Sequence, residues 1–107
     1  MPEWRRFKSP LVVSLSAPSV AAFANTTARL SATLGVAAIE ANISCPNLEA
    51  DGRAFATEPG SAAAATRAMR AATRLPLWVK LSPNTGDIAA VARAVEAEGA
   101  DALVVAN

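Results

Sequence analysis

The chain contains no histidine and a single cysteine, Cys45. One cysteine cannot form an internal disulfide, and without histidine a zinc site is not expected. Basic and acidic residues nearly cancel, leaving a formal net charge of +1. This balance argues against a surface for nucleic acid or another polyanion. Apolar residues make up 52% of the chain, which is typical of a folded globular protein rather than a disordered one.

The sequence also lacks an apolar run long enough to cross a membrane. The first residues, Met1–Arg6, are not followed by the apolar core of a signal peptide. A cytoplasmic location without membrane association is therefore expected. At 107 residues the chain can form one small domain at most.

Apolar strands alternate with amphipathic helices after a basic, irregular segment at residues 1–9. Strands are predicted at Leu11–Ser16, Val36–Asn42, Pro76–Leu81 and Ala102–Ala106. Helices are predicted to begin at Ser19, near Pro59 and near Asp87, and to end at Gly35, Thr73 and Gly99. The first helix is expected to bury Val20, Phe23, Thr27, Leu30 and Leu34. Residues 48–57 are predicted to be loop.

This order predicts an α/β fold with right-handed crossovers and a parallel sheet over residues 10–107. No G-x-G-x-x-G follows the first strand, so a dinucleotide-binding fold lacks its characteristic motif. A complete (β/α)8 TIM barrel needs about 250 residues. The prediction is therefore a partial barrel of about four parallel strands and three helices. Such a half-barrel has two open edges, with Val13 and Val105 on the terminal strands, so the isolated chain is expected to be unstable or to self-associate.

The segment Asn42-Ile43-Ser44-Cys45-Pro46-Asn47 follows the second predicted strand, where α/β proteins place their chemistry. A thiol can act as proton acceptor or nucleophile, and asparagine amides suit a planar polar ligand. On composition alone, a lone cysteine is more often a small buried hydrophobe and Asn-Pro a turn.

Four stretches resemble the dihydroorotate dehydrogenases that use cysteine as base (class 1). The first is the Asn42–Asn47 segment. Ala54-Phe55-Ala56-Thr57-Glu58-Pro59 resembles the family's F-G-T-D-P loop, and Val79-Lys80-Leu81-Ser82-Pro83-Asn84 matches V-K-L-S-P-N. The fourth stretch is Gly99-Ala100-Asp101, which is followed by a predicted strand and Asn107. It is similar to the family's pattern of G-A-D-G, a strand and an asparagine. Their order and spacing agree with the family over nearly all of residues 10–107.

The resemblance implies oxidation of dihydroorotate to orotate in pyrimidine biosynthesis, with hydride transfer to FMN. It implies that Cys45 is the base and that Lys80 lies near the N1/O2 edge of the flavin, where a cation stabilises the reduced ring. Asn42 is expected to contact flavin and substrate, Asn47 and Asn107 to hold the substrate, and Ser14 to contact the flavin. No metal ligands are expected.

The motifs are closest to the NAD-linked B form, which implies a separate iron–sulfur and FAD subunit and a homo-oligomeric full-length enzyme. Ala56 replaces the usual glycine of the loop, and the family's phosphate-binding glycines are absent. The sequence is therefore expected to be a fragment that is inactive alone. Two alternatives stay open: a catalytically inactive half-barrel, and an enzyme like dihydropyrimidine dehydrogenase, although Asn47 stands where those enzymes have histidine.

Overall fold

The computed structural model describes residues 9–43, 46–47, 53–54, 59–82 and 87–105. Four parallel strands form one sheet in the order β1-β2-β5-β6. Their bounds are β1 Leu11–Leu15, β2 Val36–Asn42, β5 Leu77–Leu81 and β6 Ala102–Val105. The helices are α1 Val20–Ser31, α2 Pro59–Ala72 and α3 Ile88–Ala97. Every neighbouring pair in the sheet is parallel, which confirms the predicted partial barrel.

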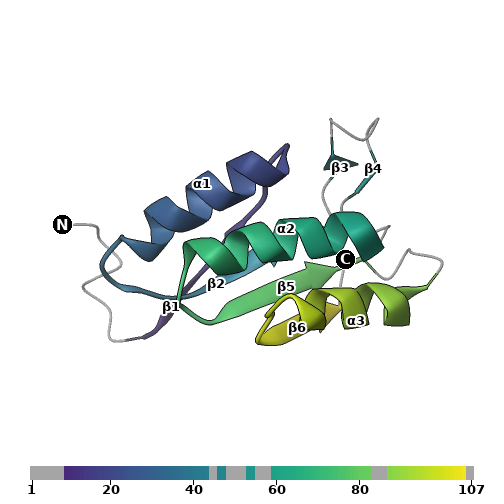
Figure 1. Cartoon of the computed structure of the whole chain (residues 1–107). Coiled ribbons are helices and arrows are strands. Elements are labelled where there is room, and N and C mark those ends of the chain that lie inside the picture. The colour runs from purple at the N-terminus through teal and green to yellow at the C-terminus, as the bar shows by residue number, and fades with distance from the viewer. Residues whose placement is uncertain (1–8, 44–45, 48–52, 55–58, 83–86, 106–107) are drawn as a thin grey trace.

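The three helices pack side by side against one face of the sheet (Figure 1), with α2 between α1 and α3. Strand residues alternate between the two faces. Ile39, Ala41, Val79 and Leu81 point toward the helices and are buried. Phe23 on α1 and Met69 on α2 complete this core, together with Val91 and Val95 on α3.

The helices begin where the capping residues predict. Ser19 accepts a hydrogen bond from the Ala22 amide, and Asp87 accepts one from the Ala90 amide. Each side chain satisfies an amide that has no partner within its helix. Leu34 was wrongly placed on the buried face of α1, because the helix ends at Ser31 and leaves Leu34 exposed. Gly35 is therefore not the cap residue; its positive φ of 96° lies in the turn before β2.

A two-stranded antiparallel hairpin was not predicted. β3 (Pro46–Asn47) pairs with β4 (Arg53–Ala54), where Arg53 and Ala54 belong to the predicted loop. Two-residue strands carry no recognisable alternation, so the sequence pattern could not reveal them. Because β2 ends at Asn42, the hairpin follows the C-terminal end of the sheet.

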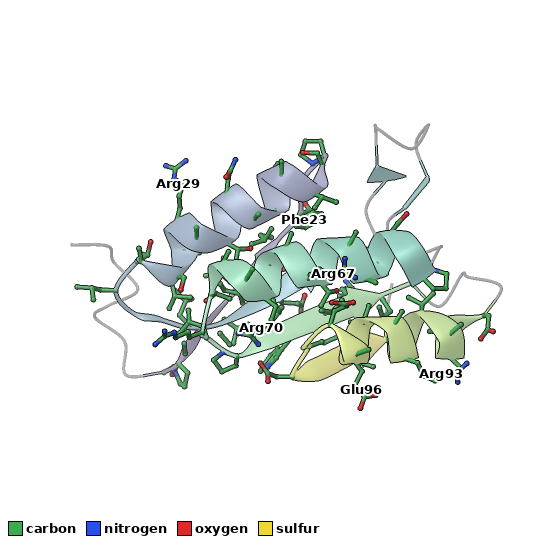
Figure 2. All side chains as sticks on the ribbon, in the orientation of Figure 1. Phe23, Arg29, Arg67, Arg70, Arg93 and Glu96 are labelled. Atoms are coloured by element: carbon green, nitrogen blue, oxygen red, sulfur yellow. The ribbon has the colours of Figure 1, made fainter. Side chains whose placement is uncertain are left out.

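A network around Arg70 joins the strands and helices at the N-terminal end of β5 and β6. The guanidinium donates to the carbonyls of Thr73, Leu75 and Gly99 at 2.7–3.1 Å, and to the Asp101 carboxylate at 2.8 Å. Asp101 also accepts the Leu77 amide at 2.8 Å. Figure 2 shows Arg70 near the end of α2, whereas Arg29, Arg93 and Glu96 point outward from their helices. The network fixes the start of β5 to the start of β6.

Gly99 fits closely against this network. Its φ is +104°, and a Cβ there would lie 2.7 Å from Cδ of Arg70. A side chain would therefore meet both an unfavourable backbone conformation and a clash. The Gly99-Ala100-Asp101 motif thus has a structural role at this end of the sheet.

We predict that replacing Thr27 by valine stabilises the fold. The Thr27 hydroxyl on α1 is buried and has no hydrogen-bond partner among the described residues. Removing an unpaired buried hydroxyl while keeping the side-chain shape should raise the free energy of unfolding by about 1 kcal/mol. Urea unfolding at fixed chain concentration measures this.

Thr66 on α2 provides the matched control. It is equally buried, but its hydroxyl donates to the Ala62 carbonyl at 2.8 Å. Thr66→Val removes a hydrogen bond that is made, so it should not stabilise. Equal stabilisation by both substitutions would show that the unpaired Thr27 hydroxyl is not the cause.

A second prediction concerns acid stability. The Leu77 amide, and then Arg70, hold the pKa of Asp101 below its usual value. A carboxyl with a lowered folded-state pKa contributes stability above its unfolded pKa of about 4 and loses it as the pH falls through the folded value. Asp101→Asn should therefore lower the free energy of unfolding at pH 7. It should also make that free energy fall less as the pH is lowered. Unfolding measured from pH 7 to pH 3 tests this, and parallel curves for the two proteins would contradict it.

Candidate active site

The face of the sheet opposite the helices carries the polar strand residues. We call it the open face; its residues are Val12, Ser14, Ala38, Glu40, Asn42, Trp78, Lys80, Ala102 and Val104. In a barrel this face is the interior. The register places these side chains in rows across the strands, since paired residues of parallel strands point to the same side.

Asn42 and Lys80 lie in one row at the C-terminal end of the sheet. They are partners in the β2–β5 register, and Val104 on β6 follows Lys80 in the same row. Both polar side chains are half-buried. The buried neighbours Ala41, Val79 and Leu81 hold the strand backbone against the helices. The side chains of Asn42 and Lys80 therefore extend from fixed backbone positions. This part of the predicted site is brought together by the structure.

Lys80 makes no ion pair with another residue of the described ranges. A cation that is half removed from water and unpaired favours an anionic ligand, because the ligand restores the charge interaction that water would otherwise supply. The ion pairs found among the described residues, Arg67–Glu98 and Arg70–Asp101, lie on the helix side and at the N-terminal end. Arg29, Arg74 and Arg93 also lack an ion pair among the described residues, but they are exposed, whereas Lys80 is half-buried.

Ser14 lies one row nearer the middle of the sheet. It pairs in register with Glu40, and its hydroxyl donates to Glu40 Oε1 at 3.1 Å. Glu40 is next to Trp78 on β5. Sequence reasoning missed Glu40, because it was read as part of a buried strand; the alternation of faces from Ile39 to Asn42 was the available signal. The predicted flavin contact of Ser14 stays a prediction.

The remaining predicted residues are described only in part. Cys45 and Asn107 lie outside the described residues. Asn47 belongs to β3, where its backbone pairs with Arg53. Ile43 is fully buried directly after β2. Among the described residues, no group of three side chains could hold a metal ion.

Within the described ranges, no helix has the length and apolar character needed to cross a membrane. The fold is that of part of an α/β barrel. It resembles the carboxyl transferase domain of Rhizobium etli pyruvate carboxylase in complex with 3-hydroxypyruvate, with a TM-score of 0.65 at 18% identity. The match covers 86% of this chain and 16% of that one. This likeness concerns the fold alone.

The model of the dihydroorotate dehydrogenase family matches residues 2–107. The chain therefore belongs to the dihydroorotate dehydrogenase family. Dihydroorotate dehydrogenase A (fumarate) of Lacticaseibacillus paracasei is 49% identical over 92% of this chain. The catalytic subunit of dihydroorotate dehydrogenase B (NAD(+)) of Desulforudis audaxviator is 47% identical over 100% of it. The chain covers 34% and 35% of the length of these two relatives.

Proposed function

We propose that this chain is the part of a class 1 dihydroorotate dehydrogenase that carries the catalytic base and a lysine that contacts the cofactor. The enzyme would oxidise dihydroorotate to orotate in pyrimidine biosynthesis. The observation that carries the proposal is the row formed by Asn42 and Lys80 on the open face, at the C-terminal end of the sheet. Barrel enzymes build their active sites at this end.

The family implies a flavin, and the residues of the open face fit one. Lys80 presents a cation without an ion-pair partner in the described ranges, and Asn42 presents an amide beside it. When bound, FMN would supply the hydride acceptor. Lys80 would hold a positive charge against the cofactor ring, and Asn42 would orient ring and substrate by hydrogen bonds. Ser14, hydrogen-bonded to Glu40, would complete the polar side of the same face.

Cys45 would take the proton from dihydroorotate. This requires either a thiolate at neutral pH or a relay that removes the thiol proton. Asn47 and Asn107 would bind the carboxylate and the ring amides of the substrate by hydrogen bonds. The resemblance and the order of the motifs support these roles.

The relatives include both fumarate-linked and NAD-linked enzymes. We propose the NAD-linked form, on the strength of the V-K-L-S-P-N and F-x-T-[DE]-P motifs. It would act with a separate electron-transfer subunit that contains an iron–sulfur centre and FAD.

A chimera tests the function. Residues 1–107 replace the matching segment of the Desulforudis audaxviator catalytic subunit, which aligns with the whole of this chain. The chimera should bind FMN and reduce it with dihydroorotate. Cys45→Ala should retain the flavin while anaerobic reduction slows by roughly 10²–10⁴, the usual contribution of a positioned general base. Stopped-flow absorbance measures the rate.

Cys45→Ser separates a base from a structural residue. A hydroxyl is harder to deprotonate than a thiol, so the serine variant should keep part of the rate and move its pH optimum upward. Reduction of the Cys45→Ala chimera at the parental rate and with the same pH profile would remove Cys45 from the mechanism. A chimera that binds FMN but reacts only with dihydropyrimidines would favour the other flavoenzyme class.

Lys80→Met in the chimera should weaken flavin retention and lower the flavin reduction potential, because the charge that stabilises the reduced ring is lost. Arg93→Met is the matched control, since Arg93 is an exposed cation that points away from α3. Flavin occupancy and potential are measured by absorbance during redox titration. Equal effects of the two substitutions would indicate that Lys80 does not contact the flavin.

A further inference from the structure

The open face carries an acid and a base on neighbouring strands. Among its described residues, Glu40 on β2 is the one acid and Lys80 on β5 is the one base. Glu40 pairs in register with Trp78, and Lys80 is the next residue of β5 on the same face. From the spacing of residues along a strand and between strands, their Cα atoms are about 8 Å apart on a diagonal. Two long side chains can meet across such a diagonal.

The Glu40 carboxylate is held on the other side of β2. Ser14 on β1 donates its hydroxyl to Glu40 Oε1 at 3.1 Å. Because β2 lies between β1 and β5, this hydrogen bond keeps the carboxylate toward β1 and away from Lys80. Lys80 accordingly has no ion pair with a described residue. Glu40 and Lys80 are both half-buried, which strengthens their attraction, so the bond from Ser14 competes with an ion pair that would otherwise be favourable.

We propose that Ser14 is a positioning residue, which holds the Glu40 carboxylate toward β1 and thereby keeps Lys80 available to the flavin. The inference rests on the proposed function, in which Lys80 contacts FMN. It assigns Ser14 a role that acts through Glu40 and Lys80, and it requires no contact between Ser14 and the flavin. Glu40 in turn is the group whose position decides whether the cation is free.

An internal ion pair would weaken Lys80 in two ways. FMN would have to break the pair with Glu40 before the ammonium group could contact the ring, so the affinity for FMN would fall. A carboxylate beside the ammonium group would also cancel part of the positive potential that stabilises the reduced ring. Enclosing the open face in a complete barrel excludes water and strengthens both effects. The position of the carboxylate therefore matters most in the complete enzyme.

A single hydroxyl is sufficient for this role. A hydrogen bond from a hydroxyl to a carboxylate is charge-assisted and stronger than one between neutral groups. A lysine–glutamate pair that water still reaches contributes little stability, because water screens the charges and two flexible side chains must be ordered. The bond from Ser14 can therefore decide between the two positions of the Glu40 carboxylate. Serine is also uncharged, so it directs the carboxylate without adding a second cation to the face.

The test uses the chimera described above and two measurements. Ser14→Ala should raise the dissociation constant of FMN by about three- to tenfold, because the released carboxylate competes for Lys80. After removal of FMN, the same substitution should slow acetylation of Lys80 by acetic anhydride about threefold, since a paired ammonium group loses its proton less readily. Flavin fluorescence measures binding, and peptide mass spectrometry measures acetylation. Ser14→Thr retains the hydroxyl and should match the parent in both measurements.

A second substitution distinguishes positioning from a direct flavin contact. Adding Glu40→Gln to Ser14→Ala should return FMN binding and Lys80 acetylation to the parent's values, because glutamine has no charge to pair with Lys80. Glu96→Gln in the same background is the matched control and should restore neither, since Glu96 is an exposed acid that points outward from α3 (Figure 2). A double variant that binds FMN as weakly as Ser14→Ala alone would overturn the proposal and indicate that Ser14 contacts the flavin itself.

Glu40→Gln alone gives a measurement that does not require the Ser14→Ala variant to fold. Because Ser14 already holds the carboxylate away, removing its charge should change Lys80 acetylation by less than about twofold. An increase of about threefold or more would show that Glu40 pairs with Lys80 in the parent, which would overturn the proposal. The proposed function fails on a different result, namely unchanged FMN binding in Lys80→Met. Unchanged Lys80 acetylation in Ser14→Ala would contradict the positioning role alone.

Discussion

The hydrogen-bonded parallel ladder is the constraint on which the rest of the structure depends. Because β1, β2, β5 and β6 run in one direction, their C-terminal ends meet at one rim. The connections between them must cross back over the sheet, and each crossing is a helix. All three helices cover the same face, which buries most of one set of alternate strand residues and leaves the other set on the open face.

The two ends of the sheet have different roles. At the N-terminal end, Arg70 and Asp101 link the Leu77 amide of β5 to carbonyls just after α2 and α3. At the C-terminal end, Asn42 and Lys80 share a row of the open face. The bonds of Arg70 and Asp101 thus lie at the end of the sheet opposite the proposed site. Barrel enzymes divide their two ends in the same way.

The proposed enzyme function depends on enclosing the open face. A half-ring cannot exclude water from Lys80, and charge interactions strengthen when water is excluded. Within a longer enzyme, further strands would enclose the face. The half-buried row of Asn42 and Lys80 thus explains why the proposed catalysis requires a complete barrel.

The sequence by itself determined the four strands of the parallel sheet, the helix starts and the parallel order, because these depend on local alternation, capping and connection length. β2 was predicted at its observed bounds, Val36–Asn42, and α3 at its cap, Asp87. The motifs also identified the family and the row residues Asn42 and Lys80. Tertiary structure decided the rest. The contact of Ser14 with Glu40 and the bonds of Arg70 to Gly99 and Asp101 join residues 26 to 31 positions apart, so no local pattern encodes them. The strands β3 and β4 are too short to show a pattern of their own.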